Sequence, residues 1–307
     1  MHADVHCDSL AEARRLLRRE PPFRALRLNS LRADLRDAAD EASLLGLIED
    51  AASHESLRRF RAIWHRALEP FALHALVDAA LRRRWTAVDM CAAQLTPASV
   101  PALERLVSGG ALKALAITGN DCPLLDVPTA VALGRALQTS RTLTRLLLTE
   151  VGLWRDVQAA TMLLTALVAH PTLHTLDVSN NGVGAHGAFA GAVFAALLAA
   201  DAPSLQALFV GKCDLGDAGM APLLAATAMN THLQELAIVG NGMSAALARR
   251  ALVPAVRACR TLVVLLTDVG RGVAWRGGSA TVGSATRQAV SRKRCVLKLS
   301  APRPRII

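Results

Sequence analysis

Apolar residues recur along this chain with one dominant spacing, Leu-x-x-Leu-x-Leu-x-x-(Asn/Cys). The spacing returns about every 29 residues, a regularity that random clustering of apolar residues does not produce. A fixed period of this length indicates a repeat protein in which each repeat forms one turn of a solenoid. The clear copies begin at Leu112, Leu173, Leu205 and Leu233, weaker copies begin at Leu57, Trp85, Leu143 and Leu262, and a degenerate copy includes Leu26 and Leu28.

Each repeat is expected to form a short strand followed by a helix. The Leu-x-Leu pair puts apolar side chains on one face of a strand because successive strand side chains point to opposite sides. Residues 129–140, 218–230 and 244–257 carry apolar side chains near helical spacing, which predicts a helix in each. Since no single repeat can bury its apolar side alone, neighbouring repeats must stack. The predicted fold is an α/β solenoid with parallel strands on its concave face and helices on its convex face.

The ninth position of the spacing follows the strand, where the chain turns inward. A small polar side chain is needed there to satisfy buried backbone groups. The position holds Ala93, Val151 and Gly270 in three copies, which interrupts the pattern. We expect a buried structural ladder formed by Asn120, Asn181, Cys213 and Asn241.

This pattern resembles the ribonuclease-inhibitor-like class of leucine-rich repeats, shared by ribonuclease inhibitor, the Ran GTPase-activating protein and the repeat domains of NOD-like receptors. The repeat length, the Asn or Cys at the ninth position and the helix in every repeat carry the resemblance. It covers residues 57–268 well and residues 23–56 poorly. It implies a leucine-rich repeat horseshoe that binds other proteins along its concave face. The Ala- and Leu-rich helices are also similar to those of repeat effectors from plant-pathogenic bacteria.

The chain divides into a cap, about eight to nine repeats and a basic tail. Residues 1–22 are expected to form an N-terminal capping helix that starts after Ser9 and ends before Pro21. Residues 23–270 hold the repeats. Nine Lys or Arg and no acid fall in residues 271–307, so this tail supplies nearly all of the net charge of +10. We interpret it as a linker followed by a strand that caps the stack.

Cysteine usage and hydropathy favour a cytoplasmic protein. The 6 cysteines form no CxxC pair and no zinc spacing, which is typical of reduced thiols. No secretory signal is apparent in the first residues. The longest uncharged run, residues 187–200, is too short to span a bilayer and coincides with a repeat helix, so we expect no membrane span. We expect a monomer.

Candidate catalytic and metal-binding groups are sparse. His2, His6, Cys7 and Asp8 cluster near the N-terminus but lack a second ligand pair. Cys7 followed by Asp8 is similar to the nucleophile of bacterial ubiquitin ligases that carry leucine-rich repeats, yet those ligases need a separate catalytic domain for which too few residues remain. We therefore expect no metal, no cofactor and no enzyme. Surface or packed histidines, without a paired nucleophile, are expected at His54, His65, His74, His170, His174 and His232.

Residues that point outward from the strands are the better candidates for function. The repeat frame predicts a basic N-terminal end with Arg27, Arg59 and Arg61, and an apolar and acidic end with Val239, Leu266 and Asp268. Apolar residues at outward positions of the middle repeats indicate contact with a partner, because such positions are ordinarily polar. The predicted partner-binding residues are Arg145, Leu147, Glu150, Asp177, Asn180, Phe209, Lys212 and Glu235.

The favoured function is a non-catalytic scaffold that binds another protein on its concave face. One alternative is a regulator of a GTPase or another enzyme, as the resemblance to the Ran activator implies. The Ran activator has an acidic tail whereas this tail is basic, which argues against that version. The other alternative is contact of residues 271–307 with a polyanion such as nucleic acid or an anionic membrane. The partner and the source of the chain do not follow from the residues.

Overall fold

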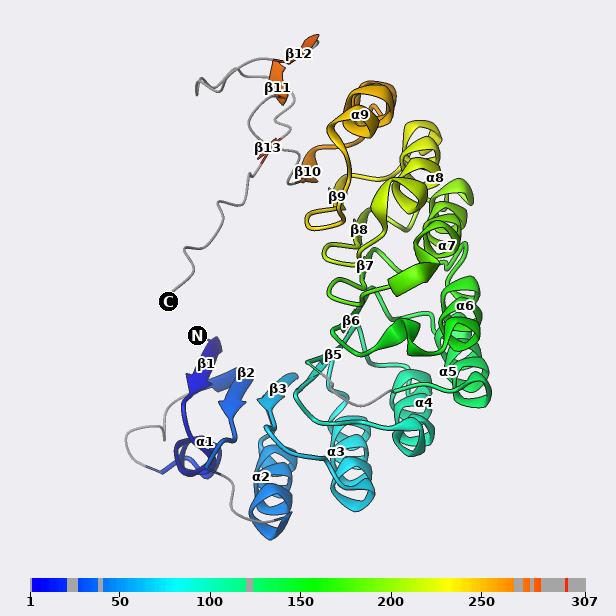
Figure 1. The fold of residues 1–307 in the computed structure, drawn as a ribbon. Helices are drawn as coiled ribbons and strands as arrows, with labels where there is room; N and C mark the ends of the chain where they lie inside the picture. The colour runs from blue at the N-terminus through cyan, green and yellow to red at the C-terminus, as the bar shows by residue number, and fades with distance from the viewer. Residues whose placement is uncertain are drawn as a thin grey trace, which may run out of the picture. The chain divides into compact units, whose positions relative to one another are not determined.

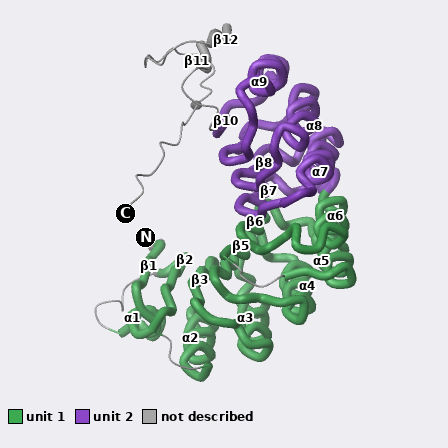
Figure 2. Tube along the Cα trace, viewed as in Figure 1, with its two compact units in different colours: residues 1–167 green, residues 168–307 purple. Residues whose placement is uncertain are grey.

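The computed structural model describes residues 2–20, 27–37, 41–119 and 124–267, together with three short strands beyond residue 270. It divides into unit 1, Met1–Leu167, and unit 2, Val168–Ile307 (Figure 2). In both units short strands and helices alternate along the chain up to residue 267, and these strands pair in parallel with their neighbours in chain order (Figure 1). The α/β repeat solenoid predicted from the sequence is therefore confirmed.

Unit 1 has six parallel strands, and a helix follows each strand on the outer side of the sheet (Figure 1). The strands are β1 (His2–Cys7), β2 (Arg27–Asp34), β3 (Arg59–Ile63), β4 (Ala87–Cys91), β5 (Ala114–Thr118) and β6 (Arg145–Thr149). The helices are α1 (Leu10–Leu17), α2 (Glu41–Ser53), α3 (Pro70–Arg83), α4 (Val100–Ser108), α5 (Val127–Thr139) and α6 (Val157–Ala166), with 3-10 turns η1 (Pro97–Ser99) and η2 (Leu153–Arg155).

Unit 2 continues the same strand and helix alternation with shorter strands. Its strands are β7 (Thr175–Asp177), β8 (Ala207–Phe209), β9 (Glu235–Ala237) and β10 (Val264–Leu266). Its helices are η3 (Gly184–His186), α7 (Gly187–Ala199), α8 (Gly216–Met229) and a last helix made of α9 (Ala245–Leu247), the π-helical segment η4 (Ala248–Leu252) and α10 (Val253–Ala258).

Three strands lie within the predicted linker and tail. Strands β11 (Val273–Arg276) and β12 (Ser279–Val282) form an antiparallel pair, which the sequence analysis did not predict. Strand β13 (Val296–Leu297) pairs in parallel with β10. The remaining residues after 267, including Asp268 and Gly270, lie outside the described part of the chain.

The core of each unit lies between the strands and the helices. On β3, Phe60 and Ala62 are buried whereas Arg59 and Arg61 are exposed, as strand alternation requires. The ring of Phe60 stacks on Trp85 at a centroid distance of 5.1 Å. Parallel register stacks the inward residues of successive strands into one apolar column, whose members in unit 1 are Leu31, Phe60, Val88, Leu115 and Leu146.

The N-terminal end departs from the sequence prediction in two ways. Strand β1 precedes the expected capping helix and pairs in parallel with β2, so residues 1–22 hold a strand as well as a helix. The helix itself begins as expected, because the Ser9 side chain accepts the backbone N–H of Glu12 at 3.1 Å. In β2 the buried residue paired with Phe60 is Leu31, so Leu28 is the first position of the degenerate copy and Leu31 is its inward strand residue.

The uncharged run that the sequence analysis assigned to a buried helix forms α7, which packs against α8. Glycine makes this contact close: a Cβ built on Gly191 would lie 2.1 Å from the carbonyl oxygen of Gly219, and one on Gly219 would lie 2.2 Å from that of Gly187. The backbones of the two helices therefore touch with no room for a side chain. Among the described residues, no helix combines the length and the apolarity needed to cross a bilayer.

The ninth-position residues of unit 2 connect neighbouring repeats. Asn241 is fully buried, donates Nδ2–H to the carbonyls of Val210 and Ile238, and accepts the backbone N–H of Cys213 at Oδ1. Asn181, 2% exposed, donates to the Val178 carbonyl at 2.9 Å. These side chains hold the turn that follows each strand. Ala93 and Val151 are buried at the same position in unit 1, and Asn120 lies outside the described residues.

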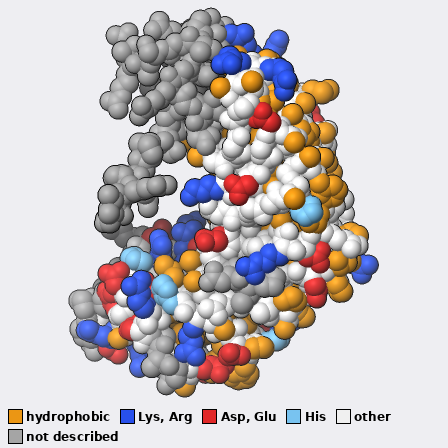
Figure 3. Space-filling view, in the orientation of Figure 1, with side chains coloured by type: hydrophobic (Ala, Val, Ile, Leu, Met, Phe, Trp, Pro, Cys, Tyr) orange, Lys and Arg blue, Asp and Glu red, His pale blue; other side chains and the backbone are white. Residues whose placement is uncertain are grey.

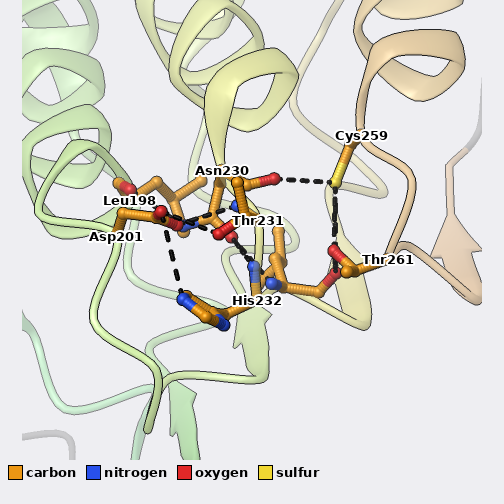
Figure 4. Close-up of polar contacts among 8 residues, drawn as sticks. Leu198, Asp201, Asn230, Thr231, His232, Cys259 and Thr261 are labelled. Carbon is orange, nitrogen blue, oxygen red and sulfur yellow. Dashed lines mark hydrogen bonds and ion pairs between the residues drawn. The ribbon is translucent and has the colours of Figure 1, made fainter.

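A second set of buried polar residues stands where a helix ends and the chain returns to a strand. We name Ser140, His170 and Asn230 the loop ladder, because each side chain accepts the backbone N–H three residues further on. Figure 4 shows how Asn230 also donates to the carbonyl of Leu198, while the thiol of Cys259 donates to the carbonyl of Asn230. Asn230 and Cys259 thus connect successive repeats of unit 2 by side-chain hydrogen bonds.

An exposed loop residue next to Asn230 is bound by an acidic side chain of the preceding repeat. Asp201 accepts hydrogen bonds from both the backbone N–H and the hydroxyl of Thr231, each at 2.8 Å (Figure 4). The backbone hydrogen bond contributes most to lowering the pKa of Asp201. Asp217 binds the N–H and hydroxyl of Ser244 in the same way. These carboxylates span the interval between one repeat and the next.

Candidate binding face

The outward side chains of unit 1 form rows that cross the strands. Because neighbouring strands pair without a shift from β3 to β6, each outward residue has a fixed neighbour on the next strand. Basic and acidic side chains lie beside one another over this unit in the space-filling view (Figure 3). One row is Arg59, Ala87, Ala114 and Arg145, and the next is Arg61, Asp89, Ala116 and Leu147.

Three arginines of this face carry charges that no described acid neutralises by contact. Arg32, Arg59 and Arg145 are exposed, and none of them forms an ion pair with any residue that the structure describes. Arg61 differs, since its Nε lies 3.5 Å from the Asp89 carboxylate. Arg59 and Arg61 were expected at this end from the repeat spacing, whereas Arg32 was not, because the degenerate copy around Leu26 and Leu28 does not match the register of β2.

The two acids among these arginines already have partners. Asp34 accepts from His65 Nε2 at 3.0 Å, and its pKa is lowered by the Arg36 backbone N–H and by the His65 and Arg36 charges in spite of desolvation. Burial raises the pKa of Asp89, and the charges of Arg61 and Arg32 oppose that rise. Asp89 Oδ1 is shielded from solvent and has no hydrogen-bond partner among the described residues. Asp34 and Asp89 thus pair with His65 and Arg61, and neither forms an ion pair with Arg59 or Arg145.

Small side chains separate the arginines of β3 from the arginine of β6. We name Ala87, Ala114 and Ala116 the alanine strip, which occupies outward positions on β4 and β5. Ala116 is 7% exposed, and the other two are half-buried. A methyl group projects little from a strand, so a partner can approach the backbone closely over this strip.

The predicted partner-binding residues of unit 1 lie on β6 and just after it. Arg145 is exposed and Leu147 is half-buried, and both point away from the buried Leu146 and Leu148. Glu150 follows the strand, is exposed, and adopts a left-handed backbone conformation with φ of 56°. The structure brings these three side chains to the outward face of one strand and its following turn.

The predicted residues of unit 2 also occupy outward or turn positions. Asp177 and Phe209 are half-buried and paired in register, and Ala237 and Leu266 continue their row. Asp177 Oδ1 accepts the N–H of Ser179 at 2.9 Å, so one carboxylate oxygen is engaged within its own turn. The exposed members of the predicted set in this unit are Asn180, Lys212 and Glu235.

Phe209 is less exposed than the sequence analysis assumed. Strand alternation places it opposite the buried Leu208, and the side chain is partly covered. Part of its apolar surface therefore contributes to the stability of the unit. The predicted central patch combines β6 of unit 1 with β7 and β8 of unit 2, and its continuity stays a prediction.

The candidate nucleophile is held in an unreactive form. Cys7 lies inside the core at 0% exposure, and its pKa is raised to about 12, chiefly by burial and further by Glu12 and Asp8. A thiolate is needed for attack, so Cys7 does not serve as a nucleophile at neutral pH. Within the described residues no cluster of three metal-ligating side chains is found. His54 and His170 are buried, in agreement with packed histidines.

Comparison with known proteins supports the repeat architecture. A family model described as "Leucine Rich repeat" matches residues 169–190, which include the clear repeat that begins at Leu173. Together with the repeated strand and helix fold, this match supports a leucine-rich repeat protein. No curated protein matches the chain.

Two solved structures are similar over parts of their chains. The tropomodulin C-terminal domain of Caenorhabditis elegans is 16% identical with a TM-score of 0.38, over 52% of this chain and 92% of that chain. A chain of the yeast Rad7 and Elc1 complex is 12% identical with a TM-score of 0.43, over 94% of this chain and 77% of that chain. Scores this low do not transfer the function of these proteins to this chain.

Proposed function

We propose that this protein is a non-catalytic scaffold that binds another protein with the outward side chains of its strands. The observation that carries the proposal is the separation of roles along each strand, with inward residues buried in the core and outward residues free to contact a partner. The backbone under these side chains is fixed by the hydrogen bonds of Asn181, Asn241 and the loop ladder. A preformed surface loses little conformational entropy on binding, which favours affinity.

The ribonuclease-inhibitor-like subclass, a cytoplasmic location and a monomeric state are part of the same proposal. The predicted set in the middle repeats, with Arg145 and Leu147 in unit 1 and Phe209 and Lys212 in unit 2, is proposed to contact the partner. Interface energy concentrates in a few partly apolar anchors with polar surroundings, and these residues combine both characters.

The test is to retain partners from a lysate of the source organism on the full chain and to map the contacts by cross-linking with mass spectrometry. Cross-links confined to strands and the turns after them are expected. Arg135→Ala on the outer helix α5 is the control, because Arg135 is exposed but does not lie on the strand face. Partners that cross-link only to helices, or that depend on Arg135, would contradict the proposal.

A further inference from the structure

We propose that the strand face of unit 1 binds an acidic α-helix, which lies along the alanine strip between Arg59 and Arg145 with carboxylates on both of its flanks. This inference rests on the proposed scaffold function and names the chemistry of the partner for one part of the face.

The spacing of the two arginines favours a helix. Arg59 on β3 and Arg145 on β6 belong to the same register row, with Ala87 and Ala114 between them. Neighbouring strands lie about 4.8 Å apart, so three intervals separate the two Cα atoms by about 14 Å. An α-helix with its side chains is about 10 to 12 Å across. One helix parallel to the strands therefore fills the interval and reaches both guanidinium groups.

The surface between the arginines allows that helix to approach. The two middle strands lie under the axis of the helix, and their outward residues are Ala87, Asp89 and Cys91 on β4 and Ala114, Ala116 and Thr118 on β5. None of these is a long or aromatic side chain, and Asp89 is already paired with Arg61. Leu147 beside Arg145 is half-buried and offers an apolar contact. The partner helix is thus expected to carry small or apolar residues on the side that faces β5.

The unneutralised positive charges of this face favour a negatively charged partner. Asp34 and Asp89 are already engaged by His65 and Arg61, whereas Arg59 and Arg145 have no acid in contact among the described residues. Carboxylates on the partner supply the missing charge, and the planar guanidinium group donates two parallel hydrogen bonds to one carboxylate in a bidentate geometry.

A nucleic acid fits this face less well. Asp89 lies within it, close to Arg61, and Glu150 is exposed at the end of β6, so a continuous phosphate backbone would meet negative charges. The outward residues of β3 to β6 include no aromatic side chain on which a base could stack. The favoured partner is therefore a protein helix.

The experiment selects binders from a displayed library of single helices with randomised surface positions, using the full chain as the target. We expect Asp and Glu to be enriched on both flanks of an apolar or small-residue stripe. Binding of the selected peptides, measured by fluorescence anisotropy, should weaken by about tenfold or more in the double variant Arg59→Glu with Arg145→Glu. It should weaken as well when Ala114→Trp fills the strip, and it should fall as salt rises.

The matched control has the same charge change outside the strand face, Arg135→Glu with Arg141→Glu, both at exposed positions. It should leave peptide affinity within about twofold of the wild type. Circular dichroism melts of every variant establish that loss of binding is not loss of fold.

Several outcomes would overturn the inference. These are a selection without binders, binders without acidic enrichment, acidic binders that retain their affinity for Arg59→Glu with Arg145→Glu, or binders that tolerate a central proline. A single-stranded oligonucleotide that binds wild type and is lost in that double variant would assign the face to nucleic acid instead. If the lysate partner cross-links only to strands of unit 2, the scaffold function stands and this inference alone fails.

Discussion

The close packing of α7 on α8 can be tested by whether a glycine-to-alanine substitution in α7 stabilises or destabilises the protein. Gly191→Ala adds one methyl group inside α7. In a solvent-exposed helix this change stabilises by about 0.5 to 1 kcal/mol, because alanine loses less conformational freedom than glycine on folding. Here the new Cβ would lie 2.1 Å from the carbonyl oxygen and 2.4 Å from the Cα of Gly219.

Backbone atoms cannot turn aside as a side chain can, so the two helices must separate. The distance from the new Cβ to the Gly219 backbone must grow by roughly 1 Å or more to reach ordinary van der Waals contact. The separation of the helices loosens the packing of the fully buried Phe194 and Leu223. Overpacking of a well-filled core costs about 1 to 3 kcal/mol or more. Since the contact is with backbone, the upper end of that range applies, and we therefore expect Gly191→Ala to lower the free energy of unfolding by about 2 kcal/mol, net of the helix gain.

Urea titration followed by circular dichroism measures the change, and hydrogen exchange of α7 and α8 locates it. Gly46→Ala in α2 is the matched control, because the atoms nearest to a Cβ there belong to the end of the Arg14 side chain and not to backbone. The control should be neutral or slightly stabilising. A Gly191→Ala protein as stable as the wild type, or more stable, would refute the close approach of the two helices.

Four further predictions concern the asparagine ladder, the buried His54, the outward face and the tail. Asn181→Leu leaves buried turn carbonyls unpaired and should cost about 1 to 3 kcal/mol of unfolding free energy, whereas an unchanged melting temperature would contradict its structural role. Burial is the largest cause that lowers the pKa of His54 from 6.5, so the folded protein holds the neutral form and stability should fall as the pH drops below 6.5. His54→Asn should flatten the curve of unfolding free energy against pH in that window, and an identical curve would show that His54 does not titrate there. Phe209→Ala should weaken partner binding by about 2 kcal/mol, measured by calorimetry, and a fold that collapses while binding persists would make the residue core instead. Deletion of residues 271–307 should abolish salt-sensitive retention on heparin. Retention that survives the deletion would show that the tail is not the polyanion-binding segment.

The repeat frame could be derived from the sequence because one chemical requirement recurs in every repeat. Inward strand positions must be apolar, and this alone placed the strands from Leu57 onward. The same signal fails at β1, whose inward residues are Val5 and the buried Cys7 rather than leucines. In β2 the inward residues are Leu31 and Ala33, so the interpretation of the copy around Leu26 and Leu28 concealed the outward position of Arg32.

The loop ladder could not be found from residue identity. Ser140, His170 and Asn230 share no chemical class, and only the geometry of accepting an N–H three residues ahead unites them. The contact between the glycines of α7 and α8 could not be predicted from the sequence for a related reason. Gly187 and Gly191 are visible in the sequence as small residues four apart, but their meaning depends on Gly219 of the next repeat.

The repeat architecture fixes the positions of the outward residues in the candidate site, but it does not fix which residue types stand at those positions. Hydrogen bonds at both ends of the repeats, through residues such as Asn241 and Asn230, fix where each strand of unit 2 lies. The inward residues are then constrained by packing, whereas the outward residues at these fixed points bear no such constraint. The repeat pattern therefore predicts where a partner can bind but carries no information about which partner it is. That information lies in departures from the pattern, such as Arg59 and Arg145 on either side of the alanine strip, which have no acidic partner among the described residues.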